Sequence, residues 1–281
     1  MKSLKESLNR ALMSKDLLDK ISDGYEYDKY EFTGETMNYK GHILYRIRAL
    51  KDIKYGYKKI KAGEDGGWIE SEKNLDQEGN CWVGDEAKVY GNAFVYEDAA
   101  IYDEAEVYGK DSRVHGKAEI SGNAKIYDNA EVYDYAQISN YAKIYGNAKV
   151  GGPKFADAQV YGNAQIFGHA IVEGGVSGKA KVYGNAQIHR LSNIVDNAEV
   201  FDNAQVSGVA EVSGKAKVYG NAIVNGNITH ISGRAKVYGN AKIKNNVDIY
   251  DRVEVFGNAE LENIRVYNDE KISCNADIQY K

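Results

Sequence analysis

Long apolar runs, clustered basic residues and cysteines are all scarce in this sequence of 281 residues. No apolar run approaches the length of a membrane span, and the N-terminal stretch lacks the apolar core of a signal peptide, which predicts a cytoplasmic protein with no membrane partner. The 36 Lys and Arg against 41 Asp and Glu leave a net charge of −5, so nucleic-acid binding is not expected. Cys81 and Cys274 lie far apart and lack metal-ligand spacing, so we predict neither a disulfide nor a metal site.

What the sequence does contain is a six-residue repeat from Val83 to its end. Val or Ile recurs at every sixth position over long stretches, as in Val89, Val95 and Ile101, and Ala usually stands two positions earlier. Six residues fit neither a helical period nor plain alternation, so we interpret each unit as a short strand followed by a corner of Gly-Asn or Asp-Asn. Such a unit cannot bury its own apolar face and is stable only when stacked on neighbours, which predicts a solenoid.

Three units complete one coil of about 18 residues, so residues 83–281 predict a triangular parallel solenoid of about eleven coils. The segment 1–82 shows a different pattern. Apolar residues from Leu4 to Ile21 recur at helical spacing, and the stretch Ile43–Leu50 alternates like a strand. We therefore predict a mainly β protein in which residues 1–82 form an N-terminal helix and a small α+β cap.

The aliphatic residue at every sixth position, with Ala two before it, resembles the hexapeptide-repeat family, which builds single-stranded left-handed parallel β-helices. The segments Ile60–Ile69 and Gly79–Val83 are similar to the junction in YdcK-like proteins, hexapeptide-repeat proteins of bacteria and phages that are labelled acyltransferases. The resemblance implies a left-handed coil, an exception to the usual right-handed crossover. It also implies an acyltransferase that uses acetyl-coenzyme A.

The position after the inward Val or Ile is repeatedly aromatic. Counting three units per coil places these side chains above one another in two series that can join through Tyr161 or Phe167. The series are Tyr90, Tyr108, Tyr127 and Tyr145, then Tyr183, Phe201, Tyr219, Tyr238 and Phe256. Stacking on neighbouring strands, at about 0.2–1 kcal/mol per pair, is one explanation of the row. The other is a flat, aromatic interaction face for a protein partner. Thr occurs at only three positions, so the Thr rows of ice-binding solenoids are missing.

Hexapeptide acyltransferases, as the resemblance implies, use a His as general base. The candidates are His115, His169, His189 and His230. We rank His230 first, because the long interval from Val224 to Val237 predicts a β-bulge that can re-aim it, and His189 second. The Gly-rich, Pro-containing C-terminal signature of acetyltransferases is absent. The His residues also lack the close pair that zinc needs in γ-class carbonic anhydrases, so no metal is predicted.

Two classes of function therefore remain, with one variant. The leading hypothesis is a non-catalytic protein-interaction or scaffold solenoid without a cofactor. It binds another protein or a second copy, as a dimer or trimer, through its aromatic face or its N-terminal cap. The alternative is a coenzyme A-dependent acyltransferase with acetyl-coenzyme A as its cofactor. A phage-borne inhibitor, whose acidic rigid rod occupies the groove of a host protein, is the third hypothesis.

Overall fold

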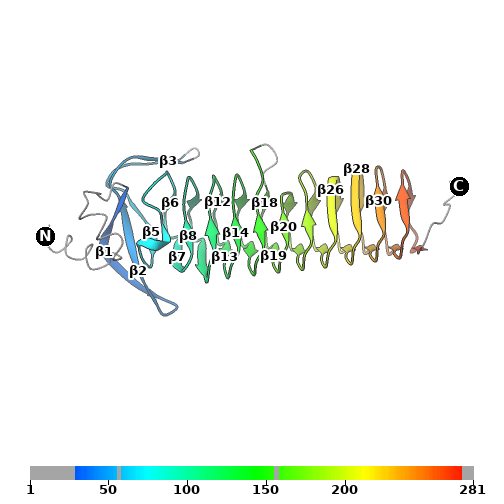
Figure 1. Cartoon of the computed structure of the whole chain (residues 1–281), viewed down its shortest axis with the longest axis horizontal. Coiled ribbons are helices and arrows are strands. Elements are labelled where there is room, and N and C mark those ends of the chain that lie inside the picture. Colours follow the sequence, from blue (N-terminus) through cyan, green and yellow to red (C-terminus); the bar gives the residue numbers. More distant parts are fainter. Residues whose placement is uncertain (1–28, 56–57, 155–157, 274–281) are drawn as a thin grey trace. The chain divides into compact units, whose positions relative to one another are not determined.

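A computed structural model describes residues 29–55, 58–154 and 158–273, in two compact units that divide between Asp134 and Tyr135. Both units are built from short parallel strands that end in corners, and together they supply about 11 turns of a β-solenoid (Figure 1). In the described residues the one helical element is a 3-10 turn, η1 (Glu72–Asn74), and no helix is long and apolar enough to cross a bilayer. The predicted N-terminal helix lies outside the described residues.

The core consists of two inward positions in each six-residue unit. Val89 and Ala87 illustrate the pattern, since the aliphatic residue of the strand and the Ala two positions before it are both fully buried. The corners have positive φ, as at Gly184 (φ 72) and Asp202 (φ 58), where Gly and Asp tolerate the left-handed backbone. The predicted strand-and-corner unit and its parallel stacking are thus confirmed.

In the N-terminal unit the strands of the solenoid form three columns, and within a column each strand pairs in parallel with the strand one turn away. The first column contains β5 (Asp65–Ile69), β7 (Lys88–Gly91), β10 (Glu106–Gly109) and β13 (Lys125–Ile126). The second contains β8 (Phe94–Val95), β11 (Arg113–Val114) and β14 (Glu131–Val132). The third contains β6 (Trp82–Val83), β9 (Ala100–Ile101) and β12 (Glu119–Ile120).

The first turn begins before the predicted boundary at residue 83. β5 pairs in parallel with β7, and Leu75 forms a parallel bridge to Val95. Ile69, Leu75 and Val83 are the inward residues of this turn, and all three are fully buried. The turn is hidden in the sequence because the interval from Leu75 to Val83 is eight residues instead of six, and because Leu replaces the usual Val or Ile. The solenoid therefore includes part of the segment that the sequence predicts as a cap.

The described part of the cap is made of strands. β1 (Tyr30–Tyr39) and β2 (His42–Ala49) form an antiparallel hairpin, and β2 continues antiparallel onto β5. Lys40 (φ 52) and Gly41 (φ 87) form its turn, with the two positive φ values of a type I′ turn. A second antiparallel pair joins β3 (Ile53–Tyr55) to β4 (Lys58–Ile60).

The C-terminal unit repeats the three columns. The first contains β16 (Lys143–Ile144), β19 (Gln165–Ile166), β22 (Lys181–Val182), β25 (Glu199–Val200), β27 (Lys217–Val218), β29 (Lys236–Val237), β32 (Glu254–Val255) and β35 (Lys271–Ile272). The second contains β17 (Lys149–Val150), β20 (Ile171–Val172), β23 (Gln187–Ile188), β30 (Lys242–Lys244) and β33 (Glu260–Glu262). The third contains β15 (Gln137–Ile138), β18 (Gln159–Val160), β21 (Gly175–Val176), β24 (Asn193–Ile194), β31 (Asp248–Ile249) and β34 (Arg265–Val266).

Two long strands continue around the corner between the second and third columns of the C-terminal unit. They are β26 (Gln205–Val212) and β28 (Ile223–Ile231), and they pair in parallel. Their register shifts after Gly208, where one more residue lies on β28 than on β26. The bulge predicted near His230 is therefore confirmed, because the extra residue of the long interval is accommodated there.

Candidate functional site

Aromatic side chains stack along the first column of both units. In the N-terminal unit the ring centroids are 4.9 Å apart from Tyr90 to Tyr108 and 5.2 Å apart from Tyr108 to Tyr127, with nearly parallel planes. We call these residues the N-terminal aromatic row. The C-terminal aromatic row has centroid separations of 4.8–5.2 Å and interplanar angles of 1–7°. It comprises Tyr145, Phe167, Tyr183, Phe201, Tyr219, Tyr238 and Phe256.

The structure decides which residue joins Tyr145 to Tyr183. Phe167 stacks on both, at 4.9 Å and 4.8 Å. Tyr161 instead follows β18 in the third column and is 47 % exposed. The interval from Val150 to Val160 is ten residues and that from Val172 to Val176 is four, so a count of six-residue units alone cannot separate the two candidates.

Asparagine side chains form a parallel row beside the C-terminal aromatic row, two positions after each ring. The amide nitrogen of each donates to the amide oxygen of the next, with N···O distances of 3.0–3.1 Å. The row comprises Asn185, Asn203, Asn221, Asn240 and Asn258. Such bonds fix the spacing of the corners, and at about 0.5–1.5 kcal/mol each they stabilise this edge.

A charged stripe lies on the other side of the aromatic rows, and Glu106 is its most buried member. The stripe comprises Lys88, Glu106 and Lys125 in the N-terminal unit and Lys181, Glu199, Lys217, Lys236 and Glu254 in the C-terminal unit. Its side chain is only 6 % exposed, and its two oxygens accept from Lys40 Nζ and Lys125 Nζ, both at 2.7 Å. Tyr90 Oη also donates to it, at 2.9 Å. Burial opposes ionisation, but the hydrogen bonds from Lys125, Lys40 and Tyr90 outweigh it and lower the pKa of Glu106 to about 2.

The β1–β2 hairpin covers this part of the N-terminal aromatic row. The Tyr39 ring meets Tyr90 edge-on at 5.9 Å, and the His42 ring lies 4.9 Å from Tyr90. Leu44 and Trp68 complete a buried cluster with Tyr90, which is only 3 % exposed. Tyr90, a predicted member of the interaction face, is therefore a core residue, because a segment distant in sequence folds onto it.

The same polar arrangement recurs in the C-terminal unit without that depth of burial. Glu199 accepts from Tyr183 Oη at 3.3 Å and from Lys217 Nζ at 3.2 Å, and its side chain is 26 % exposed. Burial, followed by the charge of Glu199, raises the pKa of Tyr183 to about 12. The C-terminal aromatic row is thus half-buried and bordered by charge.

The predicted catalytic histidines do not meet. His230 Nδ1 lies 3.0 Å from Asp248 Oδ1, and Arg265 Nε donates to the other oxygen of Asp248 at 2.9 Å. His189 follows a strand of the second column, whereas His230 lies in the third column two turns later. The Nδ1 atom of His189 lies 3.7 Å from Glu173. Burial opposes the ionisation of Asp248, but the hydrogen bonds from His230 and Arg265 lower its pKa. Each His thus contacts a different carboxylate, and the two contacts are separate.

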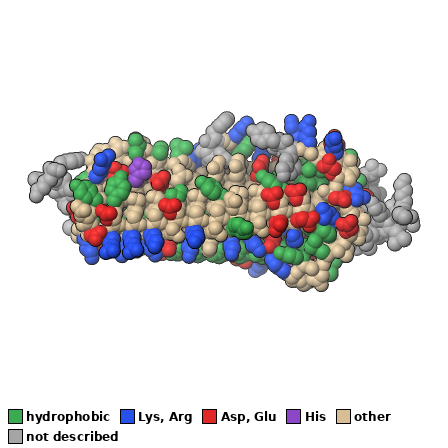
Figure 2. All heavy atoms as spheres, turned by 180° about the vertical axis from the view of Figure 1, so that it is seen from behind, with side chains coloured by type: hydrophobic (Ala, Val, Ile, Leu, Met, Phe, Trp, Pro, Cys, Tyr) green, Lys and Arg blue, Asp and Glu red, His purple; other side chains and the backbone are tan. Residues whose placement is uncertain are grey.

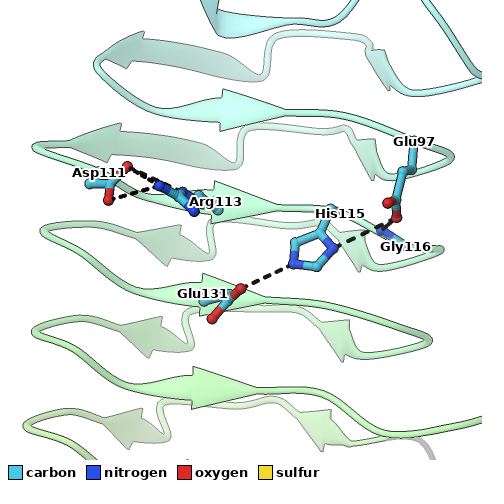
Figure 3. A network of polar contacts seen from close by, with 6 residues as sticks. All are labelled: Glu97, Asp111, Arg113, His115, Gly116 and Glu131. Carbon is cyan, nitrogen blue, oxygen red and sulfur yellow. Dashed lines mark hydrogen bonds and ion pairs between the residues drawn. The ribbon is translucent and has the colours of Figure 1, made fainter.

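His115 belongs to a short aromatic stack in the second column. Its ring lies between Tyr96, at 4.6 Å, and Tyr133, at 6.0 Å. Its two nitrogens point toward Glu97 Oε2, at 3.7 Å, and Glu131 Oε1, at 3.3 Å (Figure 3). These contacts tie three successive turns together, which is a structural role. His169 occupies a corner next to Phe167.

Sequence reasoning missed His42. Its Nδ1 lies 2.9 Å from Glu70 Oε1, and the other Glu70 oxygen accepts from the backbone N–H of Gly91 at 2.7 Å. His42 and Glu70 line a pocket of about 540 Å³, together with Ser71, Lys73, Gly91 and Asn92. No local motif announces this group, because a hairpin, a 3-10 turn and a solenoid corner meet only in the fold.

Stacking also gathers basic side chains that are scattered in the sequence. Lys179, Lys215, Arg234 and Arg252 occupy equivalent exposed corners of the C-terminal unit. Figure 2 shows Lys and Arg side chains in a row along one edge of the face that it displays. Basic side chains are therefore gathered on the surface although the sequence contains no basic run.

Metal ligation and known relatives give no further guide to function. Within residues 29–55, 58–154 and 158–273, no group of three or more His, Cys, Asp or Glu side chains is arranged to hold a metal ion. Cys81 is buried beside Lys29, and Cys274 lies outside the described residues. The sequence matches no family model and no curated protein. Function is therefore inferred from the geometry of the chain.

Proposed function

We propose that this protein is an interaction solenoid whose C-terminal aromatic row, with the charged stripe beside it, binds a protein segment. The observation that carries the proposal is the β1–β2 hairpin, which already covers an equivalent face in the N-terminal unit. There an aromatic ring packs on Tyr90 and a lysine reaches Glu106, at 2.7 Å. The hairpin thus shows, in the N-terminal unit, the kind of contact that the C-terminal aromatic row can make with a partner.

The chemistry of the C-terminal aromatic row suits protein binding. Its Tyr and Phe rings are held rigid by stacking on both neighbours, so few rotamers are lost when a partner covers them. Tyrosine hydroxyls and the Asn row supply hydrogen bonds at the rim, while the rings supply apolar area. A surface that is apolar along its centre and polar at both borders resembles the anatomy of a protein interface.

Paired substitutions test this function. Phe201→Ser with Tyr219→Ser removes two adjacent rings of the row, whereas Tyr141→Ser with Tyr161→Ser removes two tyrosines that are more exposed and lie off it, at 58 % and 47 %. Self-association is measured as weight-average mass against concentration, and binding to a purified partner by titration. The first pair should weaken association at least tenfold and the second should not. Equal behaviour of the two variants would contradict the proposal.

Acyl transfer is the second candidate, and it is supported by the resemblance and by the His230–Asp248 contact at 3.0 Å, a geometry that can orient a general base. Calorimetric binding of acetyl-coenzyme A that is lost in His230→Ala or His189→Ala would support it, and a blank titration would count against it.

Four further predictions rest on the resemblance and the composition alone, and they stay predictions. They are the left-handed winding, the hexapeptide-repeat family, the cytoplasmic location and a role as a phage-borne inhibitor.

A further inference from the structure

Two parts of the first column carry nearly the same outward residues over three turns. The N-terminal motif consists of Lys88, Tyr90, Glu106, Tyr108 and Lys125. The C-terminal motif consists of Lys181, Tyr183, Glu199, Phe201 and Lys217. In both, a Glu lies in register between two Lys, and the Tyr of the preceding turn donates to it. One ring differs, with Phe201 in place of Tyr108.

The N-terminal motif is occupied by the turn of the β1–β2 hairpin. Lys40 Nζ lies 2.7 Å from Glu106 Oε2, and also 5.4 Å from the centre of the Tyr108 ring. Tyr39 packs edge-on against Tyr90, and Lys88 Nζ lies 5.1 Å from the centre of the Tyr39 ring. The occupant therefore contributes an aromatic residue and, directly after it, a lysine at the tip of a tight turn.

The C-terminal motif offers the same groups in a more accessible state. The Glu199 side chain is 26 % exposed against 6 % for Glu106, and Lys217 is 43 % exposed against 33 % for Lys125. Glu106 accepts from two lysines, both at 2.7 Å, whereas Glu199 accepts from Lys217 at 3.2 Å. A second cation can therefore approach Glu199 as Lys40 approaches Glu106.

We propose that the C-terminal motif binds the turn of a β-hairpin from another protein, one that presents an aromatic residue followed by a lysine. This rests on the proposed function and specifies its partner. A second copy of the chain is the less favoured source, because Tyr39 and Lys40 of each copy already occupy its own N-terminal motif. The aromatic residue would pack on Tyr183 and the lysine would complete the ion pair of Glu199.

A cyclised peptide probe tests the proposal on the full chain. The probe carries residues 36–45, which include Tyr39, Lys40 and Gly41, and a fluorophore opposite the turn. Its anisotropy is followed while the chain is added up to millimolar concentration. Saturable binding is expected, and both Glu199→Gln in the chain and norleucine in place of the probe's lysine should weaken it about tenfold or more, since each removes a charged hydrogen bond.

Glu260→Gln is the matched control. It removes a carboxylate that also pairs with lysines, at 2.8 Å and 3.0 Å, but from the second column, and it should leave binding unchanged. Absence of saturable binding, or equal binding to the Glu199→Gln chain, would overturn the proposal. The chain could instead form a dimer that dissociates in Lys40→Met and on addition of the probe. That result would show that the turn comes from a second copy, and would overturn the choice of another protein. If Phe201→Ser with Tyr219→Ser still abolishes association while the probe fails, the proposed function stands and only its partner is wrong.

Discussion

Replacement of Glu106 by Gln should destabilise the N-terminal unit more than is usual for a single surface carboxylate. The carboxylate is nearly buried and holds Lys40, Lys125 and Tyr90 together. The variant removes the charge that both lysines require and leaves two cations beside a neutral amide. A pKa lowered from 4.5 to about 2 corresponds to about 3 kcal/mol of stabilisation of the folded state.

The lowered pKa also predicts how the effect of Glu106→Gln on the unfolding free energy depends on pH. Because the folded pKa lies below the unfolded value, the stabilisation is fully present above about pH 5 and is lost as the pH falls toward about 2. At pH 3 about 2 of the 3 kcal/mol should be gone. The difference in unfolding free energy between wild type and Glu106→Gln should therefore be about 2–3 kcal/mol at pH 7 and shrink to about 1 kcal/mol at pH 3.

Tryptophan fluorescence during urea unfolding measures this difference selectively. The chain has two tryptophans, Trp68 and Trp82, and both lie buried in the first turn, so their transition reports the N-terminal unit. Glu199→Gln is the control, since it makes the same chemical change in the C-terminal unit and should not move this transition. A loss below about 0.5 kcal/mol at pH 7, or a loss that does not vary with pH, would refute the role assigned to Glu106.

Three further changes probe the hairpin, the corners and the Asn row. Leu44→Ala should cost about 2–5 kcal/mol in the same fluorescence assay, because it opens a cavity beside Trp68 and Tyr90, and an unchanged midpoint would contradict this packing. Gly220→Val should destabilise the chain about 1–2 kcal/mol more than Gly220→Asn, measured by urea midpoints, because φ is 71 there and Asn tolerates it. Asn221→Ala removes two hydrogen bonds between side-chain amides. Hydrogen exchange should therefore accelerate at the adjacent corners, where the free energy of protection falls by about 1 kcal/mol, and remain unchanged in β1–β2.

The regular part of the fold was accessible from the sequence because its signal is local. Inward Val89 and outward Tyr90 follow from strand alternation, and the stacking of Tyr183 on Phe201 follows from counting three units per turn. The bulge before His230 was visible as one extra residue in an otherwise fixed interval. In each case the prediction needed only the spacing of neighbouring units.

The contacts that define the site were not accessible, because they depend on distant segments. Lys40 and Glu106 are 66 residues apart, and nothing in either neighbourhood indicates that they meet. Tyr90 is buried because the β1–β2 hairpin and Trp68 pack on it, so the predicted face was too long at this end. The one available signal was the near-identity of the two motifs around Glu106 and Glu199. The similarity of the two motifs indicates a binding surface only when the structure shows that the N-terminal motif is covered by the hairpin.

The most direct test of the central claim is site-specific photo-crosslinking from the C-terminal aromatic row. Benzoylphenylalanine at Phe201 replaces one aromatic ring by another, and the same residue at Tyr141, which is more exposed and lies off the row, is the control. Illumination in the presence of binding proteins should give a discrete protein adduct from position 201 that Glu199→Gln diminishes, and none from position 141. Equal adducts from both positions, or none from position 201, would contradict the claim that this face binds protein.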